Sequence, residues 1–123
     1  MAVNVLIVDD SAAIRKILRR VLVQAEVPVG QVHEAGDGEE ALQVLQKEKI
    51  DLVLTDINMP KMDGLEFLRR IKQIAGFEHL PVVMITTEGS KAKVLEAVKL
   101  GAAGYVRKPF TADQIKEKLA GLY

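Results

Sequence analysis

The sequence contains no cysteine, and it has no excess of charge of either sign. The absence of cysteine excludes disulfide bonds, thiolate metal sites and cysteine nucleophiles, and it agrees with a reducing compartment such as the cytoplasm. Seventeen basic residues balance seventeen acidic ones, so the chain lacks the basic excess with which nucleic-acid-binding proteins usually hold phosphates. We therefore expect no direct binding to nucleic acid.

The sequence also lacks a long apolar run. The apolar run near the N-terminus, residues 5–8, is far shorter than the roughly 20 residues of a membrane-spanning helix, and no cationic segment precedes it as in a secretory signal. No low-complexity stretch, repeat or linker suggests a second domain. The 49% of hydrophobic residues is enough to fill one core. These features predict a single cytoplasmic domain over residues 1–123 that inserts into no membrane.

Five short apolar runs alternate with five longer segments of helical periodicity. We expect the runs, several of them rich in β-branched residues, to be strands at residues 3–8, 32–35, 52–55, 82–86 and 104–107. After the first run, Ile14, Leu18 and Leu22 lie on one stripe of a predicted helix. Strands with little polar alternation, separated by amphipathic helices, predict a parallel sheet covered on both faces. The fold class is therefore α/β, doubly wound, with five βα units.

Several residues mark where these helices begin and end. Asp37, Asp63 and Thr111 each stand three residues before a Glu or Gln, the spacing of a capping box with reciprocal side-chain bonds. Gly76 and Gly101 stand where left-handed C-terminal caps are expected.

Polar residues follow the expected strands at their carboxyl ends, where doubly wound folds bind ligands. Their positions, in chain order, are Asp9 and Asp10, Asp56, Thr86 and Thr87, and Lys108 with Pro109. Taken singly, each has a local explanation, as a helix cap (Asp10 or Ser11), a turn former, a loop hydroxyl or a solvated lysine. Their coincidence at one edge of the sheet favours a common site.

Three converging carboxylates require a cation. Two unit charges about 5 Å apart repel by roughly 3 kcal/mol at an effective dielectric constant of about 20. Hard oxygen ligands favour Mg²⁺, whereas His33 and His79 are expected on a strand face and in a loop, away from the site. A carboxylate can attack a phosphoryl group once the repulsion between the two anions is neutralised. Asp56, the single acid after the central run, is the best candidate for this nucleophile.

In combination, these motifs resemble the receiver domains of bacterial two-component response regulators, especially the single-domain chemotaxis regulators. The resemblance covers nearly the whole chain in family order and spacing. It rests on residues 8–10, 56–60, 62–64, Thr86, 101–102, 104–105 and 108–110. It implies a flavodoxin-like fold with strand order 2-1-3-4-5.

The resemblance also implies a chemistry. Asp56 is then the phosphoacceptor, and Mg²⁺ is held by Asp10, Asp56 and the main-chain carbonyl of Asn58, with Asp9 acting through water. The phosphodonor is a sensor histidine kinase or a phosphotransfer protein. Thr87 departs from the small residue that is more usual in the family at this position, and we expect its bulk to slow access to Asp56.

A conformational switch is a further implication. The phosphoryl group draws in Thr86 and Lys108, Tyr105 turns inward, and the Lys108-Pro109 peptide bond is cis. The output face comprises the fourth helix, fifth strand and fifth helix. This face would bind a downstream protein with help from four lysines, Lys91, Lys93, Lys99 and Lys116. Taken singly, each of them is also explained as an ordinary solvated side chain. Since only one helix follows Lys108, we expect no output domain and a signalling protein that assists its own phosphorylation and dephosphorylation.

Three alternatives use the same fold or the same acids. A phosphatase with an aspartyl-phosphate intermediate would place an Asp-x-Asp motif near the first strand and carry a cap domain, but here Asn58 replaces the second acid. A receiver-like module that is never phosphorylated usually lacks one of the site acids or the residue that matches Thr86 or Lys108. In this sequence all of these residues are present. A flavin-binding module needs a hydroxyl- and glycine-rich loop after the first strand, where Asp9 and Asp10 would instead repel phosphate.

Overall fold

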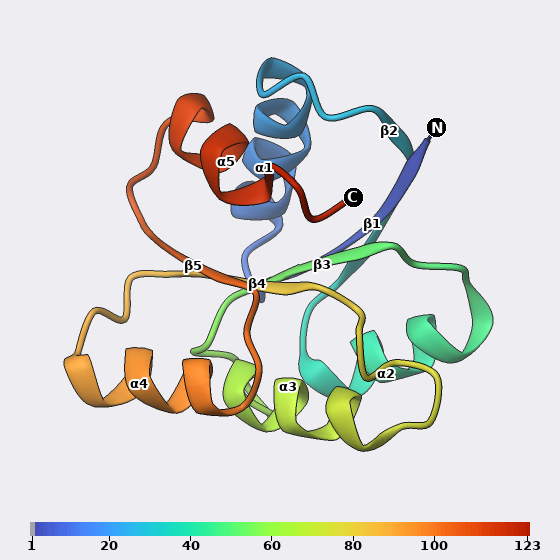
Figure 1. Cartoon of the computed structure of the whole chain (residues 1–123), viewed down its shortest axis with the longest axis vertical. Helices are drawn as coiled ribbons and strands as arrows, with labels where there is room; N and C mark the ends of the chain where they lie inside the picture. The colour runs from blue at the N-terminus through green and yellow to red at the C-terminus, as the bar shows by residue number, and fades with distance from the viewer. Residues whose placement is uncertain (1) are drawn as a thin grey trace.

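The computed structural model describes residues 2–123, and its five strands form one parallel sheet in the order β2-β1-β3-β4-β5 (Figure 1). The strands are β1 (Val3–Val8), β2 (Val29–Ala35), β3 (Leu52–Thr55), β4 (Val82–Thr86) and β5 (Gly104–Arg107). The helices are α1 (Ala12–Gln24), α2 (Gly38–Lys47), α3 (Gly64–Gln73), α4 (Lys91–Lys99) and α5 (Ala112–Leu119). The predicted fold class and strand order are confirmed.

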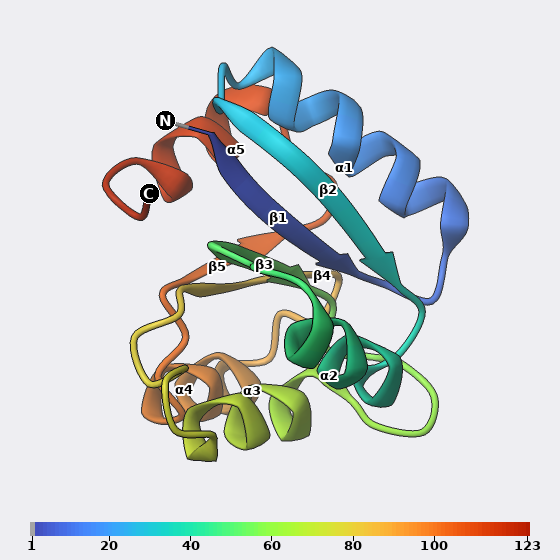
Figure 2. The same cartoon turned by 90° about the vertical axis from the view of Figure 1, so that its right-hand side faces the viewer.

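Helices cover both faces of the sheet. Figure 2 shows α1 and α5 on one side and α2, α3 and α4 on the other. Successive residues of a strand point to opposite faces, so Leu54 packs in the core under α1 and α5, while Val53 packs with Phe67 under the other layer. Every residue of β3 and of β4 is buried, as expected for central strands of a parallel sheet.

Side-chain caps begin all five helices. The three predicted N-caps are confirmed, since Asp37, Asp63 and Thr111 each accept a hydrogen bond from the amide three residues later. Ser11 rather than Asp10 caps α1, which leaves the Asp10 carboxylate free for another role. Ser90 caps α4, a signal that the sequence interpretation overlooked.

The complete capping box forms only at Thr111 in the described chain, with Gln114 bonding back to the Thr111 amide at 2.9 Å. At Asp37 and at Asp63 the expected reciprocal bond from the Glu side chain does not form. The carboxylate of Glu66 instead binds Arg69 and Arg70, two residues on its own helix that carry the opposite charge.

Of the two predicted glycine caps, one is correct. Gly101 follows α4 with φ of +96° and donates its amide to the Val98 carbonyl, as a left-handed C-terminal cap does. Gly76 also has φ of +96°, but it lies beyond the C-cap Ile74, in a turn closed by a bond from the Phe77 amide to the Ile74 carbonyl. There its positive φ serves the turn rather than the helix end.

Strand β2 begins at Val29, three residues earlier than predicted. Its first half pairs with β1 through Val3 and Val29, followed by a register shift before Val5. Because β2 is an edge strand, Gly30 and Gln31 remain exposed and interrupt the apolar pattern that the prediction relied on.

The two histidines lie where the sequence indicated. His33 is on β2 and His79 is in the turn before β4. Between residues 2 and 123, no helix is both long enough and apolar enough to cross a membrane.

Candidate functional site

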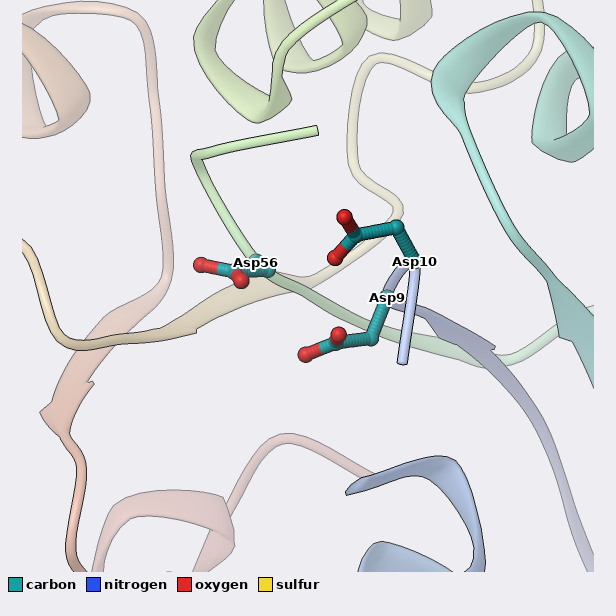
Figure 3. Close-up of side chains that lie close together, drawn as sticks. All are labelled: Asp9, Asp10 and Asp56. Carbon is teal, nitrogen blue, oxygen red and sulfur yellow. The ribbon is translucent and has the colours of Figure 1, made fainter. Parts of the chain in front are cut away.

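Three aspartates meet at the carboxyl ends of two neighbouring strands. Asp9 and Asp10 follow β1, Asp56 follows β3, and the pairing of Val8 with Thr55 brings these strand ends together. One carboxylate oxygen from each aspartate lies within 4.8 Å of the others, and Figure 3 shows the three side chains gathered beside one another. Asp9 and Asp56 are buried, whereas Asp10 is exposed. The convergence predicted from the strand ends is therefore present.

The main chain fixes one oxygen of each buried aspartate. Asp9 Oδ1 accepts a hydrogen bond from the Ser11 amide at 2.9 Å, and Asp56 Oδ1 accepts one from the Ile57 amide at 2.7 Å. The backbone of Asp56 is itself held by a 2.9 Å bond to the Val8 carbonyl. In each aspartate, Oδ2 is the oxygen directed to the shared site.

Lys108 brings a cation between the two buried carboxylates. Its Nζ lies 2.8 Å from Asp9 Oδ2 and 3.3 Å from Asp56 Oδ2. Burial lowers the pKa of Lys108, but the hydrogen bond to Asp9 and the charge of Asp56 outweigh it and raise the pKa above its usual value of 10.5. The ammonium therefore stays charged at neutral pH. The Lys108-Pro109 peptide bond is cis, as predicted.

The loop from β3 to α3 folds back closely onto Asp56. Gly64 makes this possible, because a Cβ atom there would lie 2.0 Å from the carbonyl oxygen of Asp56. The Gly64 amide also donates to the Ile57 carbonyl at 2.7 Å. Asn58 lies on this loop with an exposed side chain, and the metal-ligating role of its carbonyl stays a prediction.

Thr86 and Tyr105 are linked through the backbone of Glu88. Thr86 is fully buried, and its Oγ1 accepts a hydrogen bond from the Glu88 amide at 3.1 Å. The Tyr105 hydroxyl donates to the main-chain carbonyl of the same residue. Burial and the negative charge of Glu88 raise the pKa of Tyr105 above 10.0. Glu88 was missed from the sequence, because it contributes backbone atoms that any residue type has.

The residues present fit a divalent cation. Three carboxylates face one ammonium, so the cluster retains negative charge, and its ligand atoms are hard oxygens. In the part of the chain described, no histidine or cysteine joins this cluster. This donor set suits Mg²⁺ and disfavours metals that prefer nitrogen or sulfur.

Thr87 is exposed at the rim of the site, where it lines a mainly apolar groove of about 380 Å³ beside Lys108. Its expected effect on access to Asp56 stays a prediction.

The lysines expected on the output face are not equivalent. Lys91 and Lys99 are exposed on α4, and Lys93 is half-buried beside a groove between α3 and α4. Lys116 is engaged elsewhere, since its Nζ pairs with Glu26 at 2.5 Å in the loop after α1. Both side chains of this pair are exposed, so the role of Lys116 on the output face stays a prediction.

A sequence model of the response regulator receiver domain matches residues 5–120. The chain belongs to this family. The receiver domain is 41% identical over 120 residues to chemotaxis protein CheY-3 of Vibrio cholerae, covering 98% of this chain and 91% of that protein. It is also 41% identical over 117 residues to the chemotaxis protein CheY homolog of Campylobacter jejuni, covering 94% and 88% of the two chains.

Solved structures agree with this assignment. The receiver domain superimposes on chemotaxis response regulator CheY4 of Vibrio cholerae with a TM-score of 0.87 at 35% identity, covering 100% of both chains. A putative response regulator from Chloroflexus aurantiacus gives a TM-score of 0.89 at 30% identity, covering 99% and 98%. The protein is thus a phosphorelay signalling domain homologous to CheY regulators, and it is not an enzyme of the usual kind.

Proposed function

We propose that this receiver domain is a switch that accepts a phosphoryl group on Asp56. The observation that carries this proposal is the position of the Lys108 ammonium between Asp9 Oδ2 and Asp56 Oδ2, with the Asp10 carboxylate joining the same cluster. Such a cluster combines a nucleophile with groups that neutralise charge. The donor is a histidine kinase or a phosphotransfer protein, and the reaction takes place in the cytoplasm.

Asp9, Asp10 and Asp56, together with the Asn58 carbonyl, would hold Mg²⁺. When bound, Mg²⁺ neutralises charge on the phosphoryl oxygens. The need for it follows from the balance of charges, since Lys108 alone offsets only one of three carboxylates. Without further positive charge, the cluster would repel an anionic donor.

Asp56 Oδ2 is the attacking oxygen in this proposal. Oδ1 is occupied by the Ile57 amide, whereas Oδ2 faces the Lys108 ammonium. A new bond forms between Oδ2 and phosphorus as the bond from phosphorus to the donor's histidine nitrogen breaks, and the nitrogen keeps the electron pair. Lys108 then donates to a phosphoryl oxygen, and Thr86 can do so because its Oγ1 accepts from Glu88 and retains its own proton.

The same contacts carry the signal outward. A Thr86 hydroxyl drawn to the phosphoryl group would strain or break its bond from the Glu88 amide, and the carbonyl of that residue holds Tyr105. The movement would therefore reach α4, β5 and α5, which we propose as the face that binds a downstream protein. On α4, Leu95 and Val98 add exposed apolar surface to that face.

The central test is phosphorylation by acetyl phosphate with Mg²⁺, followed by intact mass. We expect one phosphoryl group on the wild type, none after chelation of Mg²⁺, and none on Asp56→Asn, which cannot form the acyl phosphate. Asp113→Asn, which removes an exposed acid of α5, is the matched control and should be labelled normally. Equal incorporation by Asp56→Asn would refute the assignment, and an unlabelled wild type would favour the module that is never phosphorylated.

The proposed partners require a separate experiment. Affinity capture from the organism's own extract, with and without beryllofluoride and Mg²⁺, should retain the downstream protein only in the activated state. The absence of turnover of small phosphomonoesters would set the protein apart from a phosphatase.

A further inference from the structure

Helix α1 contributes an arginine to the acidic site. Arg15 Nη1 donates a hydrogen bond of 2.5 Å to the main-chain carbonyl of Asp9, and its Nε donates one of 2.7 Å to Glu34 Oε1 on β2. The Arg15 side chain is only 19% exposed. We propose that Arg15 is a positioning residue that fixes the peptide between Asp9 and Asp10 and thereby directs the Asp10 carboxylate into the metal site. This inference rests on the magnesium-dependent function proposed above.

The contacted peptide is the one that joins two of the three acids. Because a peptide unit is planar, a donor that fixes the Asp9 carbonyl also fixes the nitrogen and Cα of Asp10. The preceding peptide is fixed separately, since the Asp9 amide donates to the Ala35 carbonyl at 3.1 Å. The backbone at Asp9 is thus held from β2 on one side and from α1 on the other.

Asp10 depends on this backbone more than its neighbours do. Asp9 and Asp56 have their own restraints, from main-chain amides and from Lys108. The Asp10 side chain is exposed, and within residues 2–123 no group donates a hydrogen bond to its carboxylate. Its direction therefore depends on the backbone on either side of it, which Arg15 fixes at the Asp9 carbonyl and which the bond from the Ser11 amide to Asp9 Oδ1 fixes after Asp10.

The guanidinium itself is firmly anchored. Glu34 accepts a hydrogen bond from Arg15 on one carboxylate oxygen, at 2.7 Å, and one from Arg19 on the other, at 2.5 Å. Arg19 also donates a hydrogen bond to the Val32 carbonyl at 3.2 Å. Burial raises the pKa of Glu34, but the two arginines outweigh it and lower the pKa below 4.5. Glu34 is therefore an anion at neutral pH. Arginine suits the bridge because its planar fork presents donors in fixed directions, which a lysine ammonium does not.

The two roles that Arg15 can have, as a nearby positive charge and as a positioning residue, predict opposite effects on Mg²⁺ binding. A cation near a metal site repels Mg²⁺, so if Arg15 acted only through its charge, Arg15→Ala would strengthen Mg²⁺ binding. If Arg15 positions Asp10, the same variant should weaken binding, because a misdirected carboxylate loses its contact with the ion. The sign of the change therefore separates the two roles.

The experiment is an NMR titration with Mg²⁺ alone, following the amides of residues 9–11 and 56–58. Groups that orient metal ligands typically change metal affinity by about 10-fold to 100-fold, and we expect Arg15→Ala to weaken Mg²⁺ binding by about 10-fold. Arg15→Lys, which keeps the charge but loses the fork, should also bind Mg²⁺ more weakly than the wild type. Arg19→Ala is the matched control, because it removes a bond to the same Glu34 but none to Asp9, and its affinity should equal that of the wild type.

Urea unfolding of the same variants separates positioning from stability. Arg15→Ala and Arg19→Ala should lose similar stability, while only the first loses Mg²⁺ affinity. Unchanged or tighter binding by Arg15→Ala would overturn the inference, and so would an equal loss in Arg19→Ala. If Arg15→Ala does not fold, Arg15→Lys decides on the same criterion. A wild type that binds no Mg²⁺ would instead overturn the proposed function, and this inference with it.

Discussion

Helices α3 and α4 pack on the same face of the sheet, but they are held to it very differently. The residues that α3 buries are Gly64, Leu65, Phe67, Leu68 and Ile71, whereas α4 buries only Ala97. On α4, Leu95 and Val98 are exposed instead. Since burial of apolar surface is the main force that holds a helix in place, α4 can be displaced at a much smaller cost than α3.

The loops that precede these helices differ in the same way. The loop before α3 begins at Asp56 and is held by the bonds from the Ile57 amide to Asp56 and from the Gly64 amide to the Ile57 carbonyl. The loop before α4 is connected to Thr86 and Tyr105 through the backbone of one residue, Glu88, whose amide donates to Thr86 and whose carbonyl accepts from Tyr105. The proposed phosphoacceptor thus lies on the rigid side of the site, and the element proposed to move lies on the other.

The largest expected effect is on stability. Phe67→Ala should lower the free energy of unfolding by about 3–5 kcal/mol, because it removes a fully buried ring and leaves a cavity. Leu95→Ala on α4 should change it by less than about 0.5 kcal/mol, because that side chain is already 54% exposed. Urea denaturation of both variants measures the difference. Comparable losses would show that α4 is held as firmly as α3.

Lys108→Ala should separate acceptance of the phosphoryl group from the response to it. Asp56 keeps its place through main-chain bonds, so acetyl phosphate should still label the variant. The response should fall, because a hydrogen bond from a charged donor contributes about 1.5–3 kcal/mol, or roughly 10-fold to 100-fold in the switching equilibrium. Amide shifts of α4 on addition of beryllofluoride measure this response.

The control for loss of a positive charge is Lys118→Ala, at a lysine in the last turn of α5 and away from the acidic cluster. This variant should respond normally. Full wild-type shifts in Lys108→Ala would show that the lysine does not transmit the signal.

Thr86→Ala should have a smaller effect of the same kind. It removes one neutral hydroxyl from the phosphoryl group and one acceptor from the Glu88 amide, a loss of about 0.5–1.5 kcal/mol for each hydrogen bond. We expect normal labelling at Asp56 with a reduced inward population of Tyr105, measured by NMR of the beryllofluoride complex. Thr86→Ser keeps the hydroxyl and should behave as the wild type does. Beryllofluoride shifts confined to α1 and α2 would contradict the proposed route.

The sequence predicted those parts of the molecule that depend on residue type. Buried strands required continuous apolar runs, and the acids and Lys108 followed those runs directly, so the composition of the cluster could be inferred before its geometry. The contributions of Arg15 and Glu88 were not foreseen. Arg15 binds a main-chain carbonyl, and Glu88 contributes its own amide and carbonyl. Backbone atoms of this kind leave no signal in a sequence.

Long-range pairing was equally invisible. Lys116 and Glu26 are brought together by the packing of α5 beside α1, which no local pattern encodes. The exposed first half of β2 was missed because one edge of a sheet needs no continuous apolar run.

The smallest expected effect concerns the titration of Tyr105, which reports whether its ring is held against the loop before α4. Burial and the charge of Glu88 both disfavour the phenolate, so its pKa lies above 10.0 in the folded protein. The stabilisation that results is fully present below pH 10.0 and is lost as the pH rises through the raised value. We expect ultraviolet difference absorbance to show this titration above 10.0, with Tyr105→Phe identifying its contribution beside that of Tyr123.

Glu88→Gln separates the two causes of that shift. The substitution removes the negative charge but keeps the main-chain carbonyl to which the Tyr105 hydroxyl donates, so the pKa should move toward 10.0 while the hydrogen bond remains. Tyr105→Phe, in contrast, loses the bond and should cost about 0.5–1.5 kcal/mol of stability. A Tyr105 pKa at or below 10.0 in the wild type would mean that the ring is solvated and free of Glu88. The loop before α4 would then lack its connection to β5, and the contrast between a rigid acceptor side and a coupled, movable side would fail.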